Sequence, residues 1–177
     1  MSSTVRLALL CLACLAQLGA VATSVVRYEL TLARGEPYRL ALAPVDPEDP
    51  YRGRYVALRF EAELTDARPP SGIDYGDPAY AVLEAGRDGF ARIRELRASP
   101  PREGDYLRVI VDTTGYRGTS VTFPFNRFFA EESLAPRVEA AYGRNPTREQ
   151  NYAIVRVRDG RGVIERLVVS GQDASEW

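Results

Sequence analysis

Apolar and polar residues follow two different patterns along this chain of 177 residues. Residues Leu7 to Val26 form an uncharged, mostly apolar run. At a helical rise of ~1.5 Å per residue, the run is about 30 Å long, which matches the hydrocarbon core of a bilayer. After Arg27 most apolar residues alternate with polar ones, which is typical of half-buried β-strands. The pattern therefore predicts one apolar N-terminal helix followed by a single β-rich domain.

The apolar run has two interpretations, a membrane anchor and a cleaved signal peptide. Arg6 before the run and the long polar domain after it favour an anchor with the domain on the extracytoplasmic side. The small-residue motif Ala20-Val21-Ala22 instead suits cleavage after Ala22, which would release a secreted domain. We favour the anchor, which divides the chain into a cytoplasmic tail (1–6), a transmembrane helix (7–26), an extracytoplasmic domain (27–172) and a C-terminal tail (173–177).

The domain contains several segments in which alternation predicts a strand. The clearest is Arg54 to Leu64, where every even-numbered residue from Val56 onward is apolar and Tyr55 and Arg59 lie on the polar face. The segment Tyr106 to Val111 repeats this parity, with Tyr106 in the place of Tyr55. The other predicted strands are Tyr28–Leu32 and Tyr38–Leu42 as a hairpin, Tyr80–Leu83, Phe90–Leu96, Val121–Phe125, and Tyr152–Arg158 with Val163–Val169 as a hairpin through an Asp159-Gly160 turn.

One soluble helix is predicted from Ser133 to Tyr142. Ser133 is a suitable N-cap, apolar residues follow at four-residue spacing, and Gly143 is a suitable terminator. The expected fold is mainly β (α+β), an antiparallel twisted sheet or partly open β-barrel with one packed α-helix, preceded by the N-terminal transmembrane helix.

The composition excludes several kinds of chemistry. The chain contains no lysine and no histidine, so it cannot form a Ser-His-Asp triad, a Ser-Lys dyad, a Schiff base or an imidazole metal site. Its cysteines, Cys11 and Cys14, both lie in the apolar run. We therefore expect no metal and no cofactor. The net charge of −1 without a basic block also argues against a nucleic-acid partner.

The most distinctive segment is rich in proline and acidic residues. Pro44, Pro47 and Pro50 recur every third residue, which favours a polyproline II conformation. That conformation would align Asp46, Asp49 and Arg52 along one edge. One interpretation is a ligand site in which Asp46 and Asp49 meet Arg52 or Arg54. The other is a rigid connection whose carboxylates accept backbone hydrogen bonds.

The same segment carries a resemblance to a known family. The run from Pro44 to Phe60, PVDPEDPYRGRYVALRF, resembles the signature of the GDYXXLXY family of bacterial proteins, whose namesake motif falls on Gly53 to Phe60. Arg54 stands where the family has Asp, and Phe60 stands where it has Tyr. The order of the later segments, from Phe128-Phe129-Ala130-Glu131 to the hairpin ending at Gly171, is also similar to the family. The resemblance implies an N-terminal membrane segment, an extracytoplasmic domain and a multi-pass membrane protein as candidate partner.

Two classes of function remain. The first is a non-catalytic interaction module for a membrane or envelope partner, with Tyr55, Arg59 and Tyr106 as exposed contact residues. The alternative is a carboxylate-dependent hydrolase acting on an envelope substrate, in which Glu131 pairs with Asp46 or Asp49 as acid and base. Glu131 also has a plain explanation, because carboxylates are favoured near a helix N-terminus.

Overall fold

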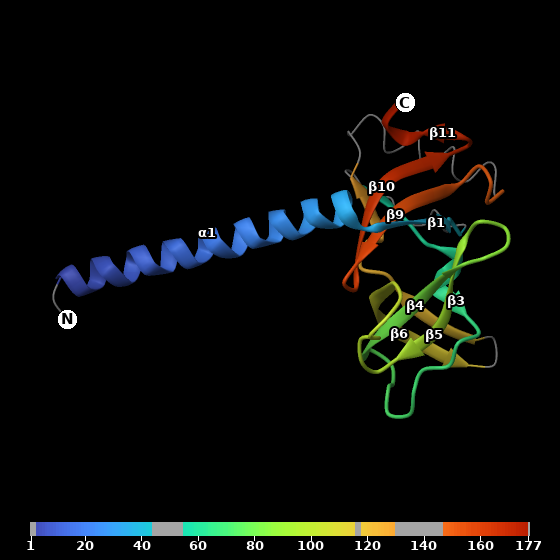
Figure 1. The fold of residues 1–177 in the computed structure, drawn as a ribbon, viewed down its shortest axis with the longest axis horizontal. Helices are drawn as coiled ribbons and strands as arrows, with labels where there is room; N and C mark the ends of the chain where they lie inside the picture. Colours follow the sequence, from blue (N-terminus) through green and yellow to red (C-terminus); the bar gives the residue numbers. More distant parts are fainter. Residues whose placement is uncertain (1–2, 44–54, 116–117, 130–146, 177) are drawn as a thin grey trace.

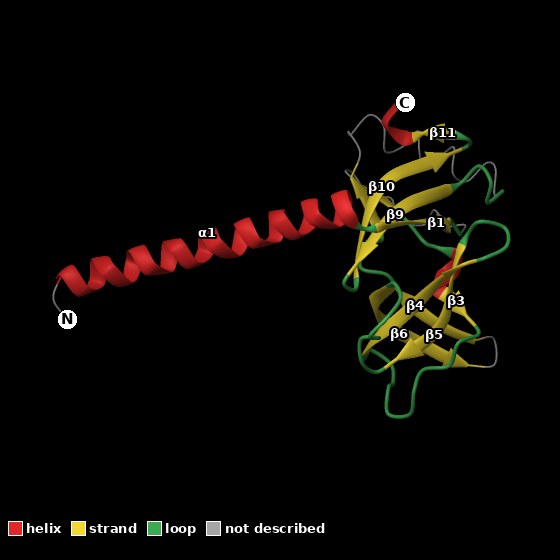
Figure 2. Ribbon diagram, viewed as in Figure 1, coloured by secondary structure: helices red, strands yellow, loops and turns green. Residues whose placement is uncertain are grey.

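The computed structural model describes residues 3–43, 55–115, 118–129 and 147–176 (Figure 1). A single long helix, α1 (Ser3–Arg34), leads from the N-terminus into a domain built from short strands (Figure 2). The helix projects away from the domain, so that the N-terminus lies far from it (Figure 1). The predicted helix Ser133–Tyr142 and most of the proline-rich segment lie outside the described residues.

The described strands form three antiparallel sheets. The four-stranded sheet has the order β1 (Glu36–Ala41), β9 (Tyr152–Arg158), β10 (Arg161–Val169), β11 (Gln172–Asp173). The five-stranded sheet has the order β3 (Leu64–Thr65), β7 (Gly118–Thr122), β6 (Tyr106–Gly115), β4 (Pro78–Ala85), β5 (Ala91–Arg97). The small sheet pairs β2 (Tyr55–Ala57) with β8 (Arg127–Phe129), and two 3-10 turns, η1 (Glu61–Glu63) and η2 (Ala174–Glu176), complete the elements.

Isolated bridges connect the two larger sheets or the segments next to them. Leu42 pairs with Phe60, and Leu107 of β6 pairs with Gly160 in the turn between β9 and β10. The mainly β, antiparallel fold with one long apolar N-terminal helix is therefore confirmed. Among the described strands the sheets do not close into a barrel.

The hairpin of β9 and β10 is confirmed as predicted. Asp159 and Gly160 both have positive φ, 49° and 77°, as the turn between two directly paired strands requires. Arg158 and Arg161 are Cα partners on either side of the turn.

The predicted first hairpin is wrong, because Tyr28 to Leu32 is helical. Helix α1 runs without interruption to Arg34, and Gly35 follows it. Extending a formed helix by another residue is easier than starting a strand, so the weak alternation of these few residues does not decide the structure. Thr31 is the residue that becomes buried, whereas Leu30 stays 36% exposed. The strand that follows, β1, pairs with β9 instead.

The strand predicted from Arg54 to Leu64 is also shorter than expected. Within the described residues it ends at Ala57, and the 3-10 turn η1 follows Phe60. Leu58, Phe60 and Ala62 are buried as the alternation predicts. The turn then shifts the parity, so Leu64 is 62% exposed and Thr65 is buried in its place.

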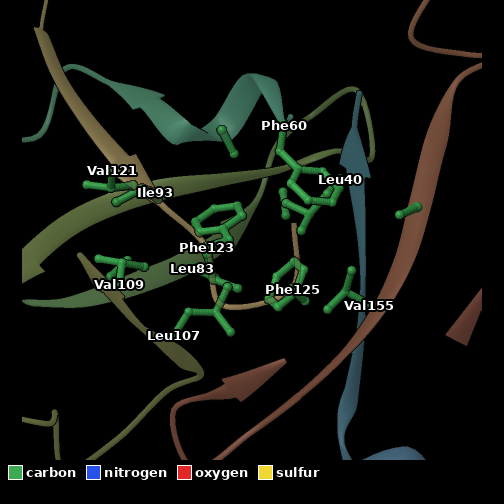
Figure 3. Close-up of a cluster of buried hydrophobic side chains, with 14 of the residues drawn as sticks. Leu40, Phe60, Leu83, Ile93, Leu107, Val109, Val121, Phe123, Phe125 and Val155 are labelled. Atoms are coloured by element: carbon green, nitrogen blue, oxygen red, sulfur yellow. The ribbon is translucent and has the colours of Figure 1, made fainter. Parts of the chain in front are cut away.

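The core lies between the two larger sheets. Three phenylalanines form its centre, because the ring of Phe60 lies 5.7 Å from that of Phe123 and 5.5 Å from that of Phe125 (Figure 3). Leu40 and Val155 approach from the four-stranded sheet, while Leu107 and Val109 approach from β6 (Figure 3). The predicted inward parity of Leu107, Val109 and Val111 is therefore confirmed.

Candidate functional site

The joint between α1 and the domain is built from buried and hydrogen-bonded groups. Thr31 is only 2% exposed and lies on the side where α1 contacts β9 and β10. The Gly35 amide donates to the Thr31 carbonyl at 2.9 Å, and the Arg156 guanidinium donates to the Gly35 carbonyl at 3.2 Å. Arg156 is itself held by both carboxylate oxygens of Glu165, at 2.8 and 3.0 Å. These contacts place the end of α1 against the four-stranded sheet.

A groove lies beside this joint, between α1 and the domain. Its volume is about 570 Å³. We call it the helix–domain groove. It is lined by Ser24, Arg27, Tyr28 and Thr31 of α1 and by Tyr80, Pro100, Tyr106, Arg108, Pro124, Asp159, Gly160, Arg161, Gly162 and Val163 of the domain.

The charge of the helix–domain groove is positive. Arg27, Arg108 and Arg161 line it, and no salt bridge joins any of them to another residue in the described part of the chain. The one acidic side chain in the lining, Asp159, lies 3.2 Å from the guanidinium of Arg158. Three guanidinium groups are therefore available to an anionic ligand.

Tyrosines form one wall of the helix–domain groove. The rings of Tyr80 and Tyr106 meet edge to face with centroids 5.7 Å apart. Burial, the nearby Asp159 carboxylate and the neighbouring Tyr80 all raise the pKa of Tyr106 above its usual value. A Cβ on Gly160 would lie 2.8 Å from the Tyr106 ring, so glycine is needed for the turn to approach the ring.

The structure describes only some of the residues predicted to form a site. Tyr106 lines the helix–domain groove, Arg59 is exposed between β2 and η1, and Tyr55 belongs to β2, in a different sheet from Tyr106. Their contact role stays a prediction. The remaining predicted site residues lie outside the described residues: Asp46, Asp49, Arg52, Arg54 and Glu131.

Two carboxylates connect distant segments of the domain through hydrogen bonds. The sequence pattern gave neither of them this role. The alternation predicts that Glu63 lies on the solvent-facing side of a strand. In the structure it accepts hydrogen bonds from the backbone amides of Phe123 at 2.9 Å and Phe60 at 3.0 Å. Burial raises the pKa of Glu63, although these two hydrogen bonds and Arg59 act in the opposite direction. Asp105 accepts the Tyr38 hydroxyl at 3.0 Å. Side-chain alternation contains no signal for either contact, because both depend on how distant segments pack.

A second groove, of about 440 Å³, lies beside β5 and has a different character. Its arginines are already paired: Arg148 lies 2.6 Å from Glu61 and 3.0 Å from Asp88, and Arg92 lies 2.6 Å from Asp88. Nearby, the Arg39 guanidinium lies 4.2 Å from the ring centre of Tyr152. These arginines already form ion pairs within the protein. We therefore expect this groove to bind an anion less well than the helix–domain groove.

The described residues contain no group of three histidine, cysteine, aspartate or glutamate side chains suited to hold a metal ion. The helix α1 is long and apolar enough to span a membrane, and a signal sequence near an N-terminus would meet the same criteria. Fold and site together define a class of protein: an antiparallel β domain that directly follows one N-terminal apolar helix.

The chain belongs to the GDYXXLXY family, because the family model described as GDYXXLXY protein matches residues 17–167. The match begins inside α1 and ends in β10, so it includes the joint and all the residues that line the helix–domain groove. Comparison with curated proteins and with solved structures gave no significant match. Within the family motif, Leu58 and Phe60 are each 2% exposed and belong to the core, whereas Arg59 between them is exposed.

Proposed function

We propose that the protein is a single-pass membrane protein whose β domain is a non-catalytic interaction module on the extracytoplasmic side. The observation that carries the proposal is the rigid joint between α1 and the domain. Thr31 is buried against the domain and the Arg156 guanidinium donates to the Gly35 carbonyl, so the end of α1 is held against the domain.

The surface of α1 supports a membrane location. Its apolar side chains are exposed on every side, which is typical of a helix surrounded by lipid or by other membrane helices. They are Val5, Leu7, Leu9, Leu10, Leu12, Leu15, Leu18, Val21, Val25 and Val26, each at least 46% exposed.

Three features favour a retained anchor over a cleaved signal peptide. The exposed apolar surface continues past Ala22 through Val25 and Val26. The helix continues without a break to Arg34, where it joins the domain. The family match begins at residue 17, before the A-x-A motif, so the family resemblance includes this part of the helix.

A rigid joint suits a partner in the same membrane. A domain on a flexible tether must lose orientational freedom when it binds, whereas a domain with a fixed direction has already lost it. The multi-pass membrane protein implied by the family resemblance would contact α1 within the bilayer and the domain above it. Glu63, Asp105 and Asp88 are engaged by groups of the protein itself, whereas the carboxylates of the hydrolase alternative lie outside the described residues.

Affinity capture of the intact, tagged protein from detergent-solubilised membranes tests this proposal. We expect quantitative mass spectrometry to find one enriched multi-pass membrane protein. The variant Gly35→Ala should lose it, because a Cβ there would collide with the Thr31 carbonyl and disturb the joint. A variant with Tyr55→Ala and Arg59→Ala tests the predicted contact residues. The exposed substitution Arg87→Gln serves as control. Recovery of no specific membrane protein, or equal recovery with Gly35→Ala, would refute the proposal.

A further inference from the structure

We propose that the helix–domain groove binds the phosphate headgroup of an anionic membrane lipid. The inference depends on the proposed function in one respect, that α1 spans a membrane. It does not depend on a protein partner.

The position of the helix–domain groove along α1 matches the membrane surface. Ser24 lies near the end of the apolar run, Arg27 directly follows the run, and both line the groove. If Leu7 to Val26 fills the hydrocarbon core, Arg27 lies at the level of the lipid headgroups. Pro124 and Val163 line the same cavity from the domain side, so the domain reaches down to this level as well.

The charges of the groove match a phosphate. Arg27 comes from α1, Arg108 from β6 and Arg161 from the start of β10, so three separate elements each contribute one guanidinium. None of them has a salt-bridge partner among the described residues, in contrast to Arg148 and Arg156. A guanidinium can donate two parallel hydrogen bonds to phosphate oxygens, and the interaction is strengthened by the opposite charges.

The size and the aromatic wall favour a lipid over a free phosphate ion. A cavity of about 570 Å³ is in the range of sites for small organic ligands and is much larger than one phosphate group. Tyr28, Tyr80 and Tyr106 supply rings and hydroxyls of the kind that gather where a protein crosses the headgroup layer. The rings would contact the glycerol and the first part of the acyl chains, while the arginines hold the phosphate.

Native mass spectrometry of the purified full-length protein tests the proposal. The protein is prepared in mixed micelles that contain equal amounts of phosphatidylglycerol and phosphatidylcholine, and the retained lipid is identified. We expect preferential retention of phosphatidylglycerol. The double variant Arg108→Gln, Arg161→Gln should bind it roughly tenfold more weakly, because two charge-assisted contacts are lost. The control Arg68→Gln, Arg87→Gln removes the same charge from exposed positions outside the groove and should bind normally.

Two further measurements keep the outcomes distinct. Arg27→Gln changes only the exposed surface of α1, so it should weaken lipid binding without unfolding the β domain. Inorganic phosphate and glycerol phosphate are titrated separately. If either competes as well as the lipid, or if the groove variants retain phosphatidylglycerol like the control, the lipid assignment is wrong. The lipid-binding measurement contains no partner protein. A failed affinity capture would therefore refute the proposed protein interaction but would not affect the lipid assignment.

Discussion

Glu63 and Phe123 lie sixty residues apart in the chain and are joined by a hydrogen bond of 2.9 Å from the Phe123 amide to the Glu63 carboxylate. The other carboxylate oxygen accepts the amide of Phe60, whose ring packs against that of Phe123. One side chain thus satisfies two backbone groups beside the aromatic core. The turn η1 is what directs it inward, which a continuous strand would not do.

We expect Glu63→Ala to lower the free energy of unfolding by about 2–4 kcal/mol, because two partly buried backbone amides lose their acceptor. Glu63→Gln should have a smaller effect, since its remaining carbonyl oxygen can accept one of the two bonds. Urea denaturation followed by circular dichroism measures both. The exposed substitution Glu103→Ala removes the same charge and should change stability by less than about 0.5 kcal/mol. Equal stability of Glu63→Ala and the control would contradict the structural role.

The bond between Tyr38 and Asp105 predicts a change of stability at high pH. Burial and the hydrogen bond to Asp105 raise the pKa of Tyr38 from 10.0 to about 12. In the unfolded chain the hydroxyl ionises near 10, whereas in the folded protein it keeps its proton to about 12. The contribution of Tyr38 to the free energy of unfolding is therefore fully present below pH 10 and is lost as the pH rises toward 12.

Tyr38→Phe should remove this part of the pH dependence. We expect the difference in unfolding free energy between the native protein and the variant to shrink as the pH rises across this interval. Ultraviolet titration of tyrosinate in the variant should also lose one tyrosine that titrates near pH 12 in the native protein. Tyr75→Phe, at a residue that is 83% exposed, is the control. If the titration curves of the native protein and of Tyr38→Phe coincide at high pH, the hydrogen bond to Asp105 does not raise the pKa of Tyr38.

The contact between Gly162 and Phe125 explains why β10 has a glycine facing the core. A Cβ at Gly162 would overlap the ring of Phe125, which is already enclosed by Phe60 and Phe123. Gly162→Ala should therefore destabilise the protein by about 1–3 kcal/mol through overpacking. Gly89→Ala is a useful comparison, because Gly89 has open space around it and a φ of 80°, so only backbone strain is added. Urea denaturation measures both variants, and if Gly162→Ala is as stable as the native protein, the ring has room to move.

Local patterns predicted those parts of the fold in which local rules decide the outcome. The β9–β10 hairpin follows from an Asp-Gly turn between alternating segments, and the buried face of β6 follows from the parity of Leu107, Val109 and Val111. Tyr28 to Leu32 was misassigned because the helix before it determines the conformation of this short segment. Its alternation was too short to outweigh helix propagation.

The candidate site could not be predicted in the same way. The helix–domain groove combines Arg27 with Arg108 and Arg161, which come from three segments far apart in the sequence. Alternation predicts that Arg108 faces solvent, but it contains no signal that Arg27 and Arg161 line the same groove. Tyr106 was the one predicted contact residue that the structure places in the groove, because its parity on β6 was correct.

The N-terminal helix gives a prediction about the mature protein. We expect the chain to keep α1, to remain in the membrane fraction after an alkaline wash, and to show an intact mass that includes residues before Ala22. Replacing Ala20 and Ala22 by Leu, which removes the A-x-A motif, should then change neither mass nor location. Leu12→Arg with Leu15→Arg should release the protein from the membrane, because each arginine at the centre of a span costs about 2.5–3.5 kcal/mol. The contrary result would be a soluble protein that begins at Thr23 and is no longer produced when Ala20 and Ala22 are replaced by Leu. That result would show that the domain is secreted.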